Sequence, residues 1–248
     1  DSDDDAEEIE FINRKMNGKG RYELWNGDVY EGDIVSGERT GHGRLTFANG
    51  NVYVGDFVDG KETGQGRKEF VYGAVYEGAF VDGKMDGRGR LEYEDGYILE
   101  GLFIDGRMQG RGRMEYEDGD VYVGRFVDGE KSGQGRYEFA NGDVYEGDFA
   151  NGLRAGKGRM VFQDGDVYEG DFVENKMTGK GRYEFSVGNF YEGDFFEDEM
   201  DGHGRYKFTN GDVYEGEWIR GERTGLGQMI FMNGDVYKGA FVGGVRTG

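Results

Sequence analysis

The two histidines are the side chains in this sequence that come nearest to general acid–base or metal-binding chemistry. His42 and His203 each occupy the middle of a Gly-x-Gly triplet, in the same local pattern but far apart in the chain. Catalytic dyads and two-histidine metal sites need ring nitrogens that converge on one point. We do not expect these two rings to meet within one molecule, and we interpret both histidines as turn residues.

The acidic amino terminus and the Gly-x-Gly triplets imitate two ligand-binding motifs. Residues 1–5 alternate acids as a calcium loop does, but Ala6 stands at the glycine position of that motif and Ile12 at its bidentate acid. A phosphate-binding glycine loop needs a following helix, whereas a strand pattern follows each triplet here. We therefore interpret the first segment as a solvated tail and the triplets as structural.

Carboxylates are abundant, and the positions of arginine indicate how they are used. Arginine follows the triplet in nine of ten copies, so cross-strand ion pairs such as Asp33 with Arg21 or Arg44 are expected. Exposed pairs contribute only ~0.2–1 kcal/mol each, which suits solubility and strand register. Since the chain also has no cysteine and only four serines, the sequence predicts no enzyme, no cofactor and no metal site.

The net charge of −21 comes from 51 acidic and 30 basic residues. Nucleic acids and anionic membrane surfaces are bound through lysine and arginine, so this charge disfavours both and favours basic partners. No apolar run could span a bilayer, and no signal peptide precedes Asp1. We expect an intracellular protein, cytoplasmic or attached to the axoneme or cytoskeleton, or in an organelle if a transit peptide was removed before Asp1.

The elements that carry these residues repeat every 23 residues. A tyrosine, replaced once by leucine, opens each of ten copies; a glycine follows two residues later and a large apolar residue four residues later. The ten openings are Tyr30, Tyr53, Tyr76, Leu99, Tyr122, Tyr145, Tyr168, Tyr191, Tyr214 and Tyr237. Each copy continues with a Gly-x-Gly triplet and ends at a glycine, usually after Asn or Asp, as in Asn26-Gly27.

Each repeat has the sequence pattern of a β-hairpin. Large residues alternate with charges in segments such as 29–35 and 20–24, which is the period-two pattern of a strand with one buried face. Asn-Gly and Asp-Gly between such segments predict a two-residue turn in which both residues have positive φ. The sequence thus predicts an all-β fold, an elongated single-layer antiparallel β-meander solenoid of ten hairpins, about 95 Å long at ~4.8 Å per strand.

Both ends of the array depart from the pattern. Residues 1–15 are predicted to form an acidic tail and a degenerate amino-terminal cap strand, in which Phe11 holds the phenylalanine position and Ile9 replaces a glycine. Residues 16–248 form the repeat array, which stops in mid-repeat at Gly248, so we expect the natural chain to continue. Unpaired end strands can pair with other chains, which predicts end-to-end oligomers unless the ends are capped.

The repeated Tyr-Glu-Gly-x-Phe sequence, the Gly-x-Gly triplet and the Asn-Gly or Asp-Gly turn resemble the MORN (membrane occupation and recognition nexus) repeat over residues 16–248. Departures are few: Leu99 for tyrosine, Tyr72 and Val187 before the turn glycine, and Asn175 and Asp198 for glycine. The resemblance implies a long, twisted single-layer meander with an aromatic-lined face. It also implies a role in protein interaction or assembly, as in ciliary, cytoskeletal and junctional proteins or as an appendage of lipid kinases and methyltransferases.

The outward columns of the repeats differ between the earlier and later copies. Later copies carry two acids in each first strand, which predicts an acidic face for a basic partner, formed by Glu146, Asp148, Glu169, Asp171, Glu192, Asp194, Glu215 and Glu217. Earlier copies replace some of these acids by apolar groups, which predicts a partner-binding patch, with random drift of surface residues as the alternative. The patch consists of Val54, Ala79, Tyr97, Leu102, Met108, Val123 and Arg125.

The aromatic face, formed by the columns of Tyr22, Leu24, Tyr30 and Ile34, admits two interpretations. In one, the sheet curls and closes this face as its core, because large exposed apolar surfaces are rare unless they are functional. In the other, the face is an open groove that an amphipathic helix or an extended peptide fills.

Two functions of different classes follow from these patterns. The first is a non-catalytic structural scaffold that spaces or staples other proteins, through basic or amphipathic segments, in a ciliary, cytoskeletal or similar assembly. The second is a regulatory or targeting appendage of a longer enzyme, such as a lipid kinase or a methyltransferase, with the catalytic part beyond Gly248. A third, direct membrane docking, is disfavoured by the acidic charge.

Overall fold

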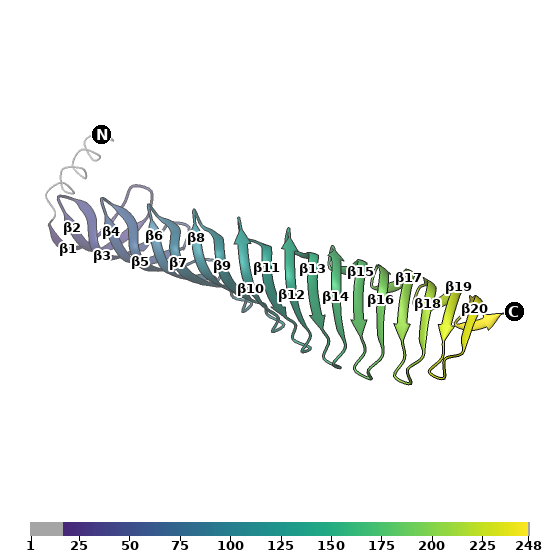
Figure 1. Cartoon of the computed structure of the whole chain (residues 1–248). Coiled ribbons are helices and arrows are strands. Elements are labelled where there is room, and N and C mark those ends of the chain that lie inside the picture. Colours follow the sequence, from purple (N-terminus) through teal and green to yellow (C-terminus); the bar gives the residue numbers. More distant parts are fainter. Residues whose placement is uncertain (1–16, 248) are drawn as a thin grey trace. The chain divides into compact units, whose positions relative to one another are not determined.

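The computed structural model describes residues 17–247, and all regular structure in this range is β-strand (Figure 1). Contacts divide the described chain into two compact units, one of residues 17–117 and 126–129 and one of residues 118–125 and 130–247. The predicted tail and cap strand, residues 1–15, lie outside the described residues. Residues 17–247 include no helix long and apolar enough to cross a membrane.

In the first unit each strand pairs antiparallel with the next one along the chain, which confirms a meander of hairpins. Seven-residue strands alternate with nine-residue strands after a shorter first strand. The strands are β1 (Gly18–Glu23), β2 (Val29–Val35), β3 (Glu38–Thr46), β4 (Val52–Val58), β5 (Lys61–Glu69), β6 (Val75–Val81), β7 (Lys84–Glu92), β8 (Ile98–Ile104) and β9 (Arg107–Glu115).

The second unit has the same antiparallel order from β11 to the last strand. Strand β10 (Val121–Val127) has residues in both units. The other strands are β11 (Glu130–Glu138), β12 (Val144–Ala150), β13 (Leu153–Val161), β14 (Val167–Val173), β15 (Lys176–Glu184), β16 (Phe190–Phe196), β17 (Glu199–Lys207), β18 (Val213–Ile219), β19 (Glu222–Ile230), β20 (Val236–Val242) and β21 (Val245–Thr247).

The Asn-Gly and Asp-Gly turns differ from the two-residue turn that the sequence pattern predicts. At Asn26-Gly27 only the glycine has positive φ, and the bonds Gly27 N–H to Leu24 C=O (2.8 Å) and Leu24 N–H to Asp28 C=O (2.7 Å) close a three-residue loop. Such a loop needs left-handed backbone only at its last residue, and glycine supplies it. The two-residue turn with positive φ at both positions lies at the other end of the hairpin, at Ser36-Gly37 (φ 54° and 84°).

Asn175 and Asp198 hold the second position of that two-residue turn, both with φ 73°. Asn and Asp tolerate left-handed backbone better than most residues, so the hairpins persist at these two departures from glycine. Their side chains also accept hydrogen bonds of 2.8 Å from backbone N–H groups of the preceding repeat, at Arg154 and Met177.

The spacing of tyrosine and glycine that recurs in each repeat has a packing cause. Gly147 of β12 faces Gly158 of β13, and the Tyr145 ring lies over both. A Cβ added at Gly147 would lie 2.5 Å from both the Tyr145 hydroxyl oxygen and the Gly158 Cα. The hydroxyl itself donates a 2.9 Å hydrogen bond to the Asp148 carbonyl. Glycine is therefore needed at both positions because the ring occupies the space of their side chains.

Tyrosine and phenylalanine form a continuous ladder in the interior of each unit. Tyr145 contacts Phe149 of its own repeat and Phe172 of the next one, with ring centroids 5.2 and 4.9 Å apart and near-perpendicular planes. Edge-to-face contacts of this kind stabilise beyond simple burial. From Tyr30 to Tyr214 the tyrosines of this column are fully buried and Phe172 is 2 % exposed, so the columns of Tyr30 and Ile34 are closed core and not an open groove, whereas Tyr22 and Leu24 are half-buried.

Neighbouring repeats are also joined at their three-residue loops. The residue after the loop glycine accepts a hydrogen bond from a backbone N–H 20 residues later, as Asp28 does from Ala48 (2.8 Å) and Asp166 from Ser186 (2.8 Å). Asp166 also accepts a 2.8 Å hydrogen bond from the Tyr183 hydroxyl. Burial by itself would raise the pKa of Asp166, but the hydrogen bonds from Ser186 and Tyr183 hold it below its ordinary value.

The Asp166 bonds predict a stability that depends on pH. Because the folded-state pKa is lowered, the stabilisation is complete above the unfolded-state pKa and is lost as pH falls through the folded-state value. We expect Asp166→Ala to cost about 1 kcal/mol at neutral pH, after allowance for solvent screening. The variant should lose less stability than the wild type between about pH 5 and 2.

Urea titrations across that pH range measure this effect. Asp164→Ala is the matched control. The Asp164 side chain accepts a hydrogen bond from the N–H of Asp166, so this bond lies within one loop and does not join two repeats. Equal acid sensitivity of the wild type and Asp166→Ala would contradict the prediction.

Candidate protein-interaction faces

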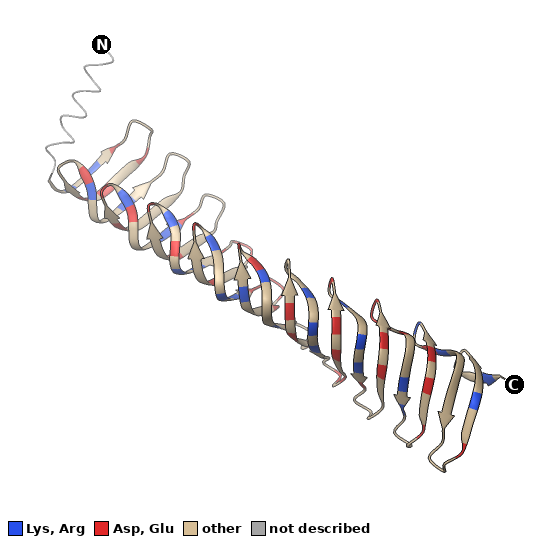
Figure 2. Ribbon diagram, turned by 45° about the horizontal axis from the view of Figure 1, so that its top comes forward, with Lys and Arg blue, Asp and Glu red and all other residues tan. Residues whose placement is uncertain are grey.

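The outward face of the second unit carries alternating columns of acids and bases. The strand register sets Glu146 of β12 opposite Arg136 on one side and Arg159 on the other, and Lys157 opposite Asp171. Figure 2 shows acidic and basic positions alternating from strand to strand in this unit. The predicted ladder of acids and bases is therefore confirmed, but the named example is wrong, because Arg21 and Arg44 both lie opposite Glu31 whereas Asp33 lies opposite Lys19 and Thr40.

Several of these charges make direct ion pairs. Arg136 lies 3.0 Å from Glu146, measured from Nε to Oε1, and Arg182 lies 3.6 Å from Glu192. Lysines of the Gly-x-Gly triplets pair with the aspartates, Lys157 with Asp171 at 2.7 Å and Lys180 with Asp194 at 2.6 Å. All four pairs are partly exposed, so each contributes less than about 1 kcal/mol.

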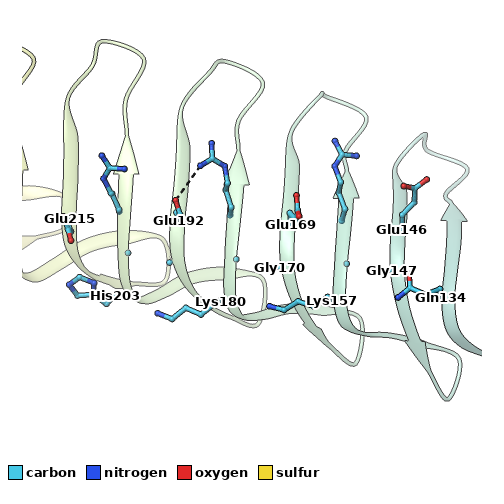
Figure 3. Close-up of a pocket in the computed structure, with 17 residues that line it drawn as sticks. Gln134, Glu146, Gly147, Lys157, Glu169, Gly170, Lys180, Glu192, His203 and Glu215 are labelled. Atoms are coloured by element: carbon cyan, nitrogen blue, oxygen red, sulfur yellow. Dashed lines mark ion pairs between the residues drawn. The ribbon is translucent and has the colours of Figure 1, made fainter.

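The side chains of this ladder line a groove of about 1070 Å³. Its floor is the backbone of the paired glycines, and Figure 3 shows glutamates and triplet side chains along it, with the Glu192 ion pair dashed. Five cations alternate with four glutamates on its walls: Lys157, Arg159, Lys180, Arg182 and Arg205 with Glu146, Glu169, Glu192 and Glu215. The charges nearly balance within the groove.

The aspartates of the outward face have a second, structural contact. At each triplet the nine-residue strand has extra residues. Gly170 and Asp171 are consecutive on β14, whereas their partners on β15 are Gly181 and Thr178, so the register shifts there. The Asp171 carboxylate accepts a 3.2 Å hydrogen bond from the N–H of Lys180 at this bulge, and Asp194 does the same for His203 at 3.0 Å. Burial alone would raise the pKa of Asp194, but its bonds to Lys180 and His203 hold it below its ordinary value.

The eight predicted acids thus share one face, but they do not form an unbroken acidic surface. Basic side chains lie between them, and three of the aspartates cap bulges, namely Asp148, Asp171 and Asp194. The sequence pattern missed the caps because the bulge that creates them is not visible in the period-two alternation. Attraction of a basic partner to this face remains a prediction.

The predicted apolar patch has members in both units. Val54, Ala79 and Leu102 lie on the outward face of the first unit, and the Leu102 side chain is 40 % exposed. Val123 and Arg125 are exposed but belong to the second unit. Leu102 is therefore the exposed large apolar residue of the predicted patch within the first unit.

Met108 is wrongly placed in that patch, because it is 1 % exposed and belongs to the core. Its repeat has Leu99 in place of tyrosine, which leaves the space over the paired glycines empty. The Met108 Cε methyl carbon fills this space: it is the nearest side-chain atom to where a Cβ at Gly112 would lie, and it is 3.2 Å from the same point at Gly101. Methionine is flexible enough to fill an irregular gap of this kind.

Tyr97 is also misplaced, because it follows a loop glycine and lies away from the outward face. It takes the position where other repeats have the Asp or Asn that bonds the next loop, and it packs between Tyr93 (5.4 Å) and Tyr116 (5.5 Å). The pKa of Tyr97 is raised far above the usual range, and burial is the largest cause of this rise. An aromatic cluster thus replaces the loop-to-loop hydrogen bond in this repeat.

The histidines lie where the sequence pattern puts them, in separate triplets. His42 Nδ1 is 3.2 Å from Asp56 Oδ1, and its side chain is mostly exposed. His203 is in the second unit, and its backbone N–H bonds Asp194. Within residues 17–247 no group of three His, Cys, Asp or Glu side chains could hold a metal ion.

The fold and the repeated side-chain columns define a β-hairpin repeat protein. The MORN repeat family matches nine consecutive segments, which are residues 30–52, 53–73, 76–96, 100–121, 122–144, 145–167, 168–190, 191–213 and 214–236. The chain therefore belongs to the MORN repeat family. The short gaps between matches fall at Ala74 and at Tyr97 to Leu99, where the loop aspartate and the core tyrosine are replaced.

A comparison with curated proteins gives no match. Among solved structures, the wild-type TCP10 domain of Danio rerio CPAP is 12 % identical, with a TM-score of 0.30, covering 89 % of this chain and 94 % of that chain. A mutant of the same domain has 13 % identity and a TM-score of 0.47, covering 90 % and 99 %. The TCP domain of Drosophila melanogaster SAS-4 has 10 % identity and a TM-score of 0.40, covering 63 % and 86 %.

Proposed function

We propose that this chain is a non-catalytic scaffold that binds other proteins along its outward face and spaces or staples them in a larger assembly. Membership of the MORN repeat family supports a role in protein or membrane interaction. Repetition in register supports the spacing role, because each repeat offers the same side-chain columns at a fixed interval. We place the assembly in the cytoplasm, at a cilium or on the cytoskeleton.

The change of chemistry along the outward face is the observation that carries this proposal. At the position of the bulge-capping Asp171, the first two repeats of the first unit also have aspartate, Asp33 and Asp56, but its next two have Ala79 and the exposed Leu102. Aspartate at this position is useful within the fold, since it caps a bulge and pairs with a cation. We infer from its replacement by a leucine that is 40 % exposed that a partner covers this part of the outward face.

Affinity capture with the whole chain as bait tests the proposal. Leu102→Asp places on the first unit the residue type that the second unit has, so the fold should be retained. Val173→Asp is the matched control, because Val173 is an exposed valine of the second unit (58 %). We expect at least one protein to be retained by the wild type and by Val173→Asp and to be reduced about tenfold or more by Leu102→Asp.

The captured protein must then be purified and titrated against the three forms of the bait. A saturable complex with the same order of affinities would support the scaffold function. Identical binding to all three forms, or conversion of the captured protein into a product by the bait, would contradict it.

A further inference from the structure

A second groove, of about 720 Å³, lies on the outward face of the first unit. Its floor is the backbone of one row of paired glycines, in which Gly66 pairs with Gly78 and Gly89 with Gly101. We call it the arginine–leucine groove after its walls. It is lined by Gln65, Gly66, Arg67, Glu77, Gly78, Arg88, Gly89, Arg90, Glu100, Gly101, Leu102 and Arg111.

Positive charge exceeds negative charge in this groove. Four arginines face two glutamates, although the whole chain has a net charge of −21. Two of the arginines have carboxylate partners, Arg67 with Glu77 at 3.0 Å and Arg90 with Glu92 at 2.5 Å. Arg88 and Arg111 are exposed and make no ion pair with any residue of the described range 17–247.

The unpaired state of Arg88 has a direct cause in the strand register. Arg88 of β7 lies opposite Leu102 of β8. In the second unit the equivalent cation, Lys157, lies opposite Asp171 and pairs with it at 2.7 Å. At this pair of strands the first unit has therefore kept the cation and lost the carboxylate, and it presents an apolar side chain in the place of that carboxylate.

The two unpaired arginines flank the leucine. Arg88 lies on β7 and Arg111 on β9, two strand spacings or about 10 Å apart, with Leu102 on β8 between them. Side chains of an extended peptide point alternately to opposite faces, so residues i, i+2 and i+4 share one face, with i and i+4 about 13 Å apart. The long, exposed arginine side chains can span that separation, and carboxylates at i and i+4 would place the side chain at i+2 over Leu102.

We propose that the arginine–leucine groove binds a short acidic segment of another protein, with two carboxylates four residues apart and an apolar side chain midway between them. The proposal rests on the scaffold function and names the chemistry of its partner. Glu77 and Glu100 line the same groove and would repel the closely spaced phosphates of nucleic acids or anionic membranes, whereas two separated carboxylates avoid them. Arginine also pairs with carboxylates in a directed, bidentate geometry.

Fluorescence anisotropy with labelled synthetic peptides and the whole chain tests the proposal. The acidic probe is a nine-residue peptide of alanine and glycine that has two glutamates four residues apart and a leucine midway between them. Matched probes replace both glutamates by glutamine or by lysine. We expect saturable binding of the acidic probe, at least about tenfold weaker binding of the other two, and weakening as salt rises from about 50 to 500 mM.

Variants of the groove locate the binding. Arg88→Ala and Arg111→Ala should each weaken the acidic probe about fivefold or more, and Lys157→Ala, at the paired cation of the second unit, should leave it unchanged. Leu102→Asp should weaken it about tenfold or more, because the new carboxylate pairs with Arg88 as Asp171 pairs with Lys157. This variant keeps the native pattern of the array, so loss of binding would not reflect unfolding, which circular dichroism checks.

Equal binding of the glutamine probe, or binding unchanged in Leu102→Asp, would overturn the proposal. So would tighter binding of an RNA oligonucleotide or of phosphatidylserine vesicles to the same arginines. A captured partner that is lost with Leu102→Asp but retained with Arg88→Ala and Arg111→Ala would refute the acidic segment and leave the scaffold function standing. Failure of the scaffold function itself would show as the absence of any partner that responds to Leu102→Asp.

Discussion

Gly147→Ala should destabilise the second unit by about 3 kcal/mol or more, although it adds only one methyl group to strand β12. The added carbon would lie 2.5 Å from the Tyr145 hydroxyl oxygen, 2.5 Å from the Gly158 Cα and 2.6 Å from the Lys157 carbonyl oxygen. Two of these three atoms belong to backbone, so rotation of a side chain cannot relieve the contact. Chemical denaturation followed by circular dichroism measures the loss.

Two other glycines separate this effect from backbone strain. Gly152 has φ 79° and open space around an added Cβ, so Gly152→Ala should cost only the left-handed conformation of alanine, about 1–2 kcal/mol. Gly101 holds the same column as Gly147, but its repeat has Leu99, and the nearest atoms to an added Cβ are 3.2 Å away. Gly101→Ala should therefore be milder than Gly147→Ala. A larger loss at Gly101 or at Gly152 than at Gly147 would contradict the packing explanation.

Phe172→Ala should cost about 3–5 kcal/mol and loosen the contact between two repeats. Its ring contacts Tyr145 of the preceding repeat and Tyr168 of its own repeat, with centroids 4.9 and 5.2 Å away, and the Arg154 guanidinium lies 5.6 Å from its centroid. Removal of the ring leaves a cavity at the junction of the two repeats. Because repeats contact only their neighbours, unfolding should become less cooperative there.

Hydrogen exchange resolved by peptide is the measurement for Phe172→Ala, since local opening appears as faster exchange on both sides of the junction. Val173→Ala is the control: Val173 is the next residue, is 58 % exposed and should change stability by less than about 0.5 kcal/mol. Uniform acceleration across the whole second unit would show instead that the array unfolds as one cooperative body.

The repeated columns made most of the fold predictable from the sequence. Alternation and the 23-residue period placed strands such as β2 within a residue, because burial on one face imposes that pattern directly. The turn type was not predictable in this way: an Asn-Gly pair suits both a two-residue turn and a three-residue loop. The length of the unpaired segment decides between them, and here residues 24–28 separate the strands.

The candidate site was harder to predict because it depends on exceptions to the pattern. Met108 could have been excluded, since a repeat that lacks its core tyrosine at Leu99 needs another side chain to fill the space. Arg88 and Arg111 could not be singled out from the sequence, because each is the middle residue of a Gly-x-Gly triplet like those of the other repeats. Their importance appears only when the register sets Arg88 opposite Leu102 rather than opposite a carboxylate.

The junction between repeats uses few features that are specific to one repeat. A backbone bond joins the two-residue turns to the preceding repeat, as from Gly60 N–H to the Arg39 carbonyl (3.0 Å), and the tyrosine–phenylalanine contact recurs from repeat to repeat except where Leu99 replaces the tyrosine and Trp218 the phenylalanine. Unequal crossing-over between two copies of such a gene would therefore yield a longer or shorter array with no new kind of interface. Repeat number can change in evolution by whole units, while the arginine–leucine groove, formed by successive unlike repeats, would be lost or duplicated only as a block.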